Sequence, residues 1–333
     1  MTEQIKRKRV WTMARMREKT KNSSLKLTSY SSWFDMIRGD FKRNFGIYAI
    51  ALPGILYYLI FGYIPMYGII IAFKDYSPGL GILGSPWVGF EHFISFFSSY
   101  YFTRVIRNTI LLNLYLIVFG FPVPIILALS LNELRGKYLK KTVQSITYLP
   151  HFISSVIICG MIVDFTSSSG FITTIVNAFG GNYNNLLHKE EFFRTIYVAS
   201  DIWQTFGWSS IIYLAAMSGL DTELYEAAML DGANKFKQLI HITLPGIAPT
   251  IIIMFILRIG QVMSLGAEKV ILLYNPVVYE TADIISSYVY RKGLVESDYS
   301  FSTAVGMFNS LINCALIYIS NLISRKFSET SLF

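Results

Sequence analysis

Charged residues are scarce in this sequence. They make up 15% of its 333 residues, whereas an ordinary soluble domain carries about 25%. Hydrophobic residues make up 53%, and the mean hydropathy is +0.45. This composition is too apolar for a soluble chain of this length, so it excludes that class and indicates an integral membrane protein.

Cysteine and histidine are also rare, with two and four copies. Cys159 and Cys314 both lie inside apolar runs, which is typical of small core residues, and no second histidine or cysteine stands at metal-ligand spacing. The sequence contains neither the phosphate-binding pattern G-x-x-x-x-G-K-[ST] nor a recognisable pairing of nucleophile and base. We therefore expect no metal, no cofactor and no enzymatic activity in this chain.

Acidic residues are few near the N-terminus, where residues 1–45 hold twelve Lys and Arg against four Asp and Glu. A basic arm directly before a membrane span is typical of a topology signal in contact with lipid headgroups, so no nucleic-acid partner is expected. Residues 31–48 predict a short interfacial helix with aromatic side chains toward lipid. The next apolar run is about twice as long as that of a signal peptide.

Six apolar runs are long enough to cross a bilayer, which takes about 20 residues. Prolines inside several of them predict kinked helices around a cavity. With the N-terminus inside, 20 Lys and Arg fall on the cytoplasmic side and 8 on the outer side, which places both termini in the cytoplasm. The predicted spans are 47–73, 108–132, 143–165, 193–217, 247–265 and 302–324.

The predicted fold is thus an all-α polytopic membrane protein with six transmembrane helices. We expect a basic cytoplasmic arm at 1–45, a transmembrane domain at 46–328 and a short cytoplasmic tail at 329–333. The segment 266–300 is expected to be a long solvent-facing loop.

The polar stretch between the fourth and fifth predicted spans, residues 218–246, is here named the coupling loop. Asp221 or Thr222 can cap a helix that Gly232 ends. Asn234 can cap a second, amphipathic helix, which Pro245 is expected to stop before the next span. A mere connection would need only a few polar residues, so this pattern predicts a rigid surface offered to a cytosolic partner.

The coupling loop also carries a known motif. Glu226-Ala227-Ala228, then Gly232 after three residues, Ile242 after nine more, and Leu244-Pro245 after one more reproduce the EAA signature. This pattern resembles the permease subunits of binding-protein-dependent ABC importers. The surrounding "ELYEAAMLDGA", together with "FKDYSPG", "WVGFEHF" and "YLPHFIS", is similar to the carbohydrate branch that imports oligosaccharides from complex polysaccharides. The likeness covers most of the chain after residue 45, but the long basic arm departs from it.

The resemblance implies a set of partners in a bacterial cell membrane. These are a second homologous permease, two ATPase subunits that bind ATP and Mg, an extracellular solute-binding protein and an oligosaccharide. In the family, the glutamate of the motif pairs with a basic residue of the ATPase, while the two alanines let the backbones approach. The residues to which this role is carried over are Glu226, Ala227, Ala228, Asp231, Gly232, Leu244 and Pro245.

Charged side chains at membrane depth are costly, so they usually face a cavity or a partner. Asp201 and Arg258 stand near the middle of their predicted spans, and two interpretations remain open: a structural ion pair, or a solute site. Arg258 would suit a solute that carries carboxylates. Asn309 and Asn313 share a helix face and fit either a solute path or a polar helix seam. The candidate solute-path residues are Asp201, Trp203, Gln204, Trp208, Arg258, Gln261, Asn309 and Asn313.

Two alternatives to an oligosaccharide importer stay open. A permease of the same class could carry another solute, such as a peptide or glycerol phosphate. A membrane regulator could instead signal through the coupling loop and transport nothing.

Overall fold

The computed structural model describes residues 33–134, 136–263 and 265–327. Within these residues all regular secondary structure is helical, and an isolated bridge between Lys74 and Trp87 is the one β-type pairing. The predicted all-α class is therefore confirmed. The chain divides into two compact units, Met1–Tyr67 and Gly68–Phe333, and each is described by itself.

The first unit contains the predicted interfacial helix and most of the first candidate span. Helix α2 (Trp33–Arg43) is followed by α3 (Phe45–Tyr58), the π-helix η1 (Leu59–Tyr63) and the 3-10 helix η2 (Ile64–Phe73), which continues into the second unit. None of the residues of α3 is buried, as suits a helix that lipid or another chain covers. Residues 1–32 and the predicted tail 329–333 lie outside the described residues.

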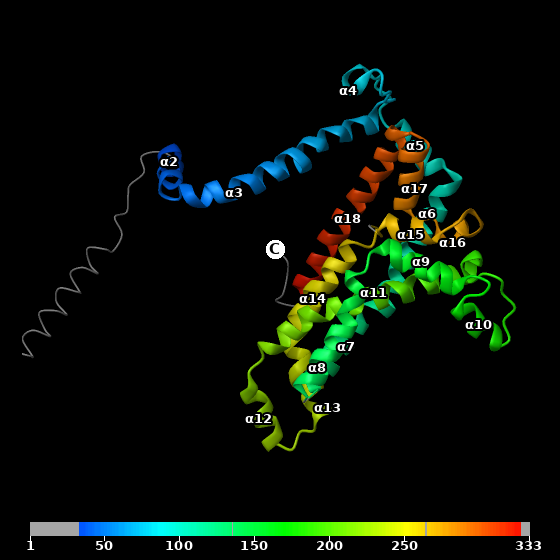
Figure 1. Cartoon of the computed structure of the whole chain (residues 1–333). Coiled ribbons are helices and arrows are strands. Elements are labelled where there is room, and N and C mark those ends of the chain that lie inside the picture. Colours follow the sequence, from blue (N-terminus) through cyan, green and yellow to red (C-terminus); the bar gives the residue numbers. More distant parts are fainter. Residues whose placement is uncertain (1–32, 135, 264, 328–333) are drawn as a thin grey trace, which may run out of the picture. The chain divides into compact units, whose positions relative to one another are not determined.

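The second unit is a helical assembly in which α7, α8, α11 and α14 run toward α12 and α13 at one end (Figure 1). Short helices between α14 and α18 gather at the opposite end. Its helices are α4 (Gly81–Gly84), α5 (Glu91–Ser98), α6 (Tyr100–Tyr115), η3 (Leu116–Gly120), α7 (Pro122–Glu133), α8 (Lys137–Tyr148), η4 (Leu149–Phe152), α9 (Ser155–Thr166), α10 (Phe171–Ala178), η5 (Leu186–His188), α11 (Glu190–Ser218), α12 (Thr222–Leu230), α13 (Lys235–Gln238), η6 (Leu239–Thr243), α14 (Leu244–Gly260), α15 (Ala267–Leu273), η7 (Pro276–Val278), α16 (Tyr279–Ala282), α17 (Ile285–Tyr290), η8 (Arg291–Val295) and α18 (Tyr299–Phe327).

Five helical stretches of the described residues are long and apolar enough to cross a membrane. Helix α11 is not among them because charged and polar side chains lower its mean hydropathy, although its 29 residues extend for about 43 Å at 1.5 Å per residue. The count of six spans therefore stays a prediction. The five stretches are Phe45–Phe73, Tyr100–Glu133, Ser155–Ala178, Lys235–Gly260 and Tyr299–Ile323.

The predicted third span, 143–165, is wrong as a continuous helix. Helix α8 ends at Tyr148, Pro150 opens the 3-10 turn η4, and Ile153 and Ser154 are extended before α9 begins. Proline has no N–H to continue the helical ladder, and the Ser154 side chain caps the new helix by accepting from the Val156 N–H. Because of this break, His151, Ile153 and Ser154 line an internal cavity.

A second prediction fails at Pro245, which does not stop the helix. Helices α13, η6 and α14 follow one another without a gap, and Pro245 lies in the first turn of α14. The π-helical turn η6 shifts the hydrogen-bond register, with the Leu244 N–H donating to the Leu239 carbonyl. Proline is tolerated at this point because a register change already leaves backbone groups unpaired.

The segment 266–300 is also not the solvent-facing loop that was expected. It folds into short helices, α15 to α17 and their neighbours, in which Val270, Asp283 and Ile285 are fully buried. The buried Asp283 carboxylate accepts from Arg104 and Arg291. Paired in this way, a charge can remain inside the protein.

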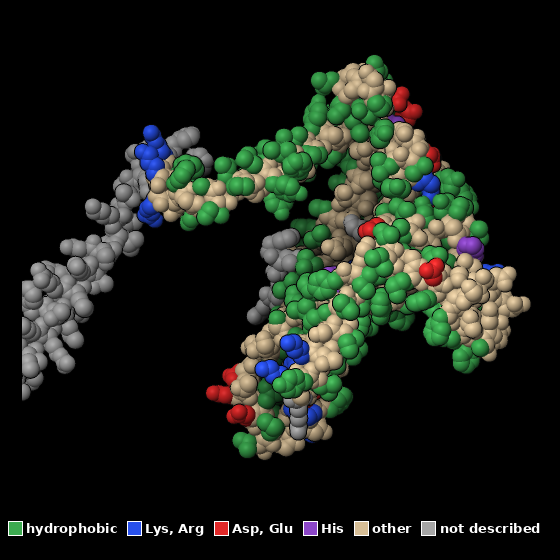
Figure 2. Space-filling model, in the orientation of Figure 1, with side chains coloured by type: hydrophobic (Ala, Val, Ile, Leu, Met, Phe, Trp, Pro, Cys, Tyr) green, Lys and Arg blue, Asp and Glu red, His purple; other side chains and the backbone are tan. Residues whose placement is uncertain are grey.

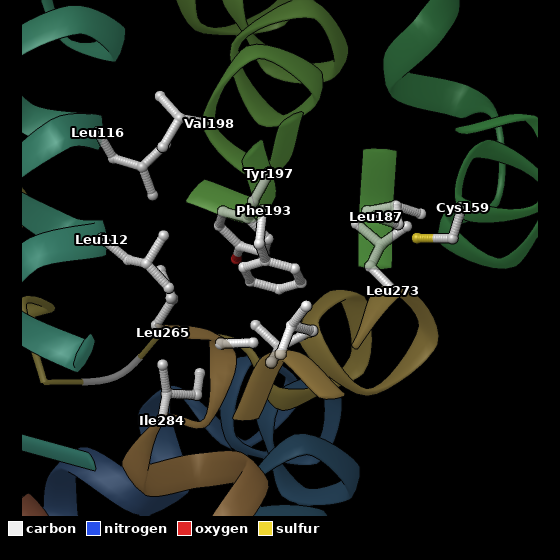
Figure 3. Packing of buried hydrophobic residues seen from close by; sticks show 13 residues of the cluster. Leu112, Leu116, Cys159, Leu187, Phe193, Tyr197, Val198, Leu265, Leu273 and Ile284 are labelled. Carbon is white, nitrogen blue, oxygen red and sulfur yellow. The ribbon is translucent and has the colours of Figure 1, made fainter. Parts of the chain in front are cut away.

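The largest hydrophobic cluster lies around the first half of α11 (Figure 3). Phe193 and Tyr197 of α11 lie between Leu112 and Leu116 on one side and Cys159 on the other. Leu116 and Tyr197 also line a polar cavity, so this core forms one wall of the candidate site.

Helices α8 and α11 approach each other closely at Gly207. A Cβ atom at this position would lie 2.0 Å from the Thr147 carbonyl oxygen, which no side chain permits. Glycine therefore lets the two backbones touch, and this packing holds η4 against α11.

Candidate functional site

A polar cavity of about 620 Å³, here named the solute cavity, is lined by side chains from α11, η4, α14 and α15. A neighbouring cavity of about 480 Å³ shares Asp201, Arg258 and Gln261 and extends along α11 and α14 to Tyr213 and Met254. Both helices lead from there to the coupling loop. The predicted path residues that the structure brings together in the solute cavity are Asp201, Gln204, Arg258 and Gln261.

Asp201 pairs with Lys269 and not with Arg258. The Lys269 ammonium lies 3.6 Å from the Asp201 carboxylate and donates to the Gln204 side-chain oxygen at 3.3 Å. No ion pair joins Asp201 to Arg258 in the part of the chain that the structure describes. The structural pair proposed from sequence is thus wrong in its partner, because α15 folds back against α11 and brings a nearer cation.

Lys269 is unusually deep for a lysine, with 8% of its surface exposed. Burial lowers the pKa of its ammonium, and the Asp201 carboxylate acts in the opposite direction. The pair therefore fixes α15 to α11, and the neighbouring Glu268 adds a carboxylate to the lining of the solute cavity.

Among the described residues that line the two cavities, Arg258 is the cation that has no paired carboxylate. Its guanidinium has no hydrogen bond or ion pair among the described residues. An arginine stays protonated at any physiological pH and presents a planar fork of donors. Both facts make Arg258 suited to a carboxylate that arrives with a solute.

Aromatic rings stand beside the solute cavity at η4. The His151 and Trp208 rings stack with centroids 4.8 Å apart and planes 5° from parallel, and Phe152 meets Trp208 edge-on. His151 and Phe152 line the solute cavity, while Trp208 is 45% exposed. This arrangement offers an apolar ring surface beside polar groups.

Three of the predicted path residues lie elsewhere. Trp203 lines a separate apolar cavity of about 380 Å³ between α9 and α11. The Asn313 side chain of α18 accepts from the Met263 N–H at 3.0 Å, just beyond the end of α14, and the Asn309 side-chain oxygen is buried with no hydrogen-bond partner among the described residues. Neither asparagine lines the solute cavity, so their place favours the polar-seam interpretation.

The first helix of the coupling loop forms as its capping residues predict. The Asp221 carboxylate accepts from the Glu223 N–H to start α12. At the other end Gly232 has a φ of +78°, and the N–H groups of Gly232 and Ala233 donate to the carbonyls of Met229 and Ala228. This is the Schellman arrangement, which favours glycine at the left-handed position.

The second helix starts where Asn234 accepts from the Lys237 N–H. Glu226 and Ala227 are exposed, and Ala228 is half-buried. Large apolar side chains surround them, with Leu230 90% and Phe236 68% exposed. Figure 2 shows acidic and basic side chains gathered at this end of the second unit. Asp231 and Pro245 are also exposed, while Leu244 is half-buried.

Sequence reasoning missed Lys269, Tyr225 and Thr243. Lys269 gave no signal, since it lies outside every predicted span, and only the folding of α15 brings it to Asp201. The Tyr225 hydroxyl and the Thr243 hydroxyl are 2.9 Å apart and join α12 to η6. A tyrosine and a threonine 18 residues apart meet here only because the loop folds back.

These features define a polytopic helical membrane protein with an internal polar cavity and an exposed two-helix loop. Residues 120–329 match the family described as the inner membrane component of binding-protein-dependent transport systems, and the chain belongs to this family. It is a permease component of an importer.

Proteins similar to this chain also belong to transport systems. The chain is 46% identical to the polygalacturonan/rhamnogalacturonan transport system permease protein YteP of Bacillus subtilis (strain 168), over 86% of this chain and 90% of that protein. It is similar to a chain of a bacterial ABC transporter involved in the import of the acidic polysaccharide alginate, with a TM-score of 0.81, 43% identity and coverage of 87% and 99%. A second structure of the alginate transporter, in complex with an alginate pentasaccharide-bound periplasmic protein, matches with a TM-score of 0.81 and 42% identity, over 88% and 99% of the two chains.

Proposed function

We propose that this chain is one of two homologous permease subunits of an ATP-driven importer for acidic oligosaccharides. The observation that carries the proposal is Arg258, a cation with no hydrogen-bond or ion-pair partner among the described residues, in a polar cavity between the helices that flank the coupling loop. YteP is named for the transport of polygalacturonan and rhamnogalacturonan, and the similar solved structure belongs to a transporter that imports alginate. Polygalacturonan and alginate both carry a carboxylate on their uronic acid units.

Recognition would combine charge with ring contact. The Arg258 guanidinium can donate two parallel hydrogen bonds to a sugar carboxylate. Amide side chains of Gln204 and Gln261 supply donors and acceptors for hydroxyl groups. The stacked rings of His151 and Trp208 offer a flat surface for the apolar face of a sugar ring. The Asp201–Lys269 pair stays intact and carries no net charge, whereas the Glu268 carboxylate, which also lines the solute cavity, would keep a solute carboxylate on the Arg258 side.

The energy would come from partners. A pair of ATPase subunits binds ATP and Mg and receives the coupling loop, in which Glu226 pairs with a basic residue. This assignment puts the loop and both termini in the cytoplasm of a bacterial cell. An extracellular binding protein delivers the oligosaccharide on the other side. Movement of the loop is passed to α11 and α14, which open the solute cavity to one side at a time.

The test of the acidic solute is the variant Arg258→Gln in the reconstituted importer. Uptake of an oligogalacturonide is compared with uptake of its methyl ester of the same length, each relative to wild type. The relative rates cancel any preference of the binding protein. We expect the acidic probe to lose about tenfold or more, as for a hydrogen bond to a charged group, and the ester to lose less than about twofold.

Two further variants make the result decisive. Arg258→Lys keeps the charge but not the fork, so an intermediate loss is expected. Lys141→Gln removes an exposed cation outside the solute cavity and should change neither rate. Equal losses of the two probes in Arg258→Gln would contradict the role of charge, and absence of any coupled uptake by wild type would contradict the importer itself.

A further inference from the structure

The coupling loop is held at several points, which include an ion pair between Lys235 and Glu133 of α7 at 3.5 Å, and one of them is a single pair of hydroxyl groups. At its start, Leu220 lies against the backbone of α14, where a Cβ atom at Gly246 would come within 2.6 Å of a Leu220 methyl group. Beyond the Gly232 turn, the buried Gln238 side chain donates to the Ala233 carbonyl at 3.0 Å. Between these points, the Tyr225 hydroxyl reaches Thr243.

The direction of the hydrogen bond between these hydroxyl groups follows from their surroundings. Thr243 is 3% exposed, and its hydroxyl lies 3.5 Å from the main-chain carbonyl oxygen of Gln238, which can only accept. If Thr243 donates to that carbonyl, its oxygen is free to accept from Tyr225. The chain of donors then runs from Tyr225 through Thr243 to Gln238, and all three polar groups are satisfied.

This contact joins the exposed helix α12 to the start of the long helix α14. Tyr225 directly precedes Glu226, and Thr243 ends the π-helical turn η6, which leads without a gap into α14. Arg258 lies 14 residues after Leu244, or about 21 Å along α14 at 1.5 Å per residue. A displacement of α12 can therefore reach the solute cavity through α14 without first passing through the Gly232 turn.

We propose that the Tyr225–Thr243 hydrogen bond is the positioning contact that transfers motion of α12 to α14. Tyr225 is a positioning residue, since it acts through α14 and does not line the solute cavity. The proposal rests on the importer function, and it adds which side chain carries the displacement across the loop. The π-helical geometry of η6 gives the contact a place where the helix can adjust its register.

The test uses the complete importer, reconstituted with its partner subunits and binding protein. The variants are Tyr225→Phe, Thr243→Val and the double variant, with Tyr138→Phe as the matched control because Tyr138 is 88% exposed on α8. The first measurement is oligogalacturonide imported per ATP hydrolysed. We expect each single variant to lower this ratio between about two- and tenfold, the factor that one hydrogen bond contributes. The double variant should be no worse than the singles.

The second measurement is amide hydrogen exchange of residues 222–233 in the same assembly without nucleotide. Faster exchange in Tyr225→Phe and Thr243→Val, with no change in Tyr138→Phe, is expected if the contact holds α12. An unchanged import ratio in both single variants, or additive losses in the double variant, would overturn the proposal. A wild-type assembly that hydrolyses ATP but imports no sugar would instead refute the importer function and the inference with it, whereas the exchange rates need no transport.

Discussion

The solute cavity and the coupling loop assemble their polar groups in opposite ways. The cavity collects side chains from η4, α11, α14 and α15, which are far apart in the chain. The polar groups of the coupling loop come from one continuous stretch of sequence, and the Glu226 side chain is exposed. Inside the membrane domain a charge must be paired or face a cavity, whereas at the surface charge costs little. The interior site is therefore specified by tertiary packing, and the loop by local rules.

The largest expected effect concerns the coupling loop, which is the exposed one of the two regions. Glu226→Lys should leave folding intact, because an exposed substitution changes the free energy of unfolding by less than about 0.5 kcal/mol. It should nevertheless lower coupled uptake about 30-fold or more, since in the proposed importer it would place a like charge against a basic residue of the ATPase partner. The measurement is sugar uptake and ATP hydrolysis in the same vesicles.

The matched control is Glu223→Lys, the same charge change one turn earlier in α12 and outside the motif. A loss below about threefold is expected from weaker helix-dipole stabilisation alone. Equal losses in both variants would show that net charge matters and the position of Glu226 does not. Uptake absent in every variant and in wild type would favour the non-transporting regulator.

A smaller effect is expected in the interior, on stability. Lys269→Met removes the partner of Asp201, whose side chain is 27% exposed. We expect the free energy of unfolding to fall by about 2 kcal/mol, less than the roughly 3–5 kcal/mol for a fully buried pair, because water still reaches Asp201. Thermal unfolding of the purified chain in detergent measures the change.

The double variant Asp201→Asn with Lys269→Met should recover part of this loss, because no unpaired charge remains. A double-mutant cycle isolates the pair. Strict additivity of the two single effects would contradict the pairing and would reopen Arg258 as the partner of Asp201.

The smallest effect concerns the local rules of the coupling loop. Asn234→Ala removes the side chain that accepts from the Lys237 N–H and should cost about 1 kcal/mol, as for other helix N-caps. The cost should appear as faster amide exchange at residues 235–239, with no change at the Asp201–Lys269 pair. A change that spreads to α11 would show that the loop and the cavity are not built independently.

The sequence predicted what depends on neighbouring residues. Asp221, Gly232 and Asn234 take the capping positions that their side chains favour, and Arg258 faces a cavity because a charge in an apolar run needs one. Lys269 could not be found, since nothing in its own segment shows that α15 is buried. The prediction that Pro245 stops the helix was wrong because the π-helical turn η6 shifts the hydrogen-bond register just before it, so the N–H that proline lacks is not needed there. The break at Pro150 was read as a kink, although the Ser154 cap starts a separate helix.

The link between the two regions is most directly measured as a distance between α11 and α14. Spin labels at Ile212 and Leu257, both exposed, report the separation of the two helices in the reconstituted importer. We expect a nonhydrolysable ATP analogue to shift the distance distribution in wild type and to leave it unchanged in Glu226→Lys. An unchanged distribution in wild type, or a shift that survives Glu226→Lys, would contradict transmission from the coupling loop to the solute cavity.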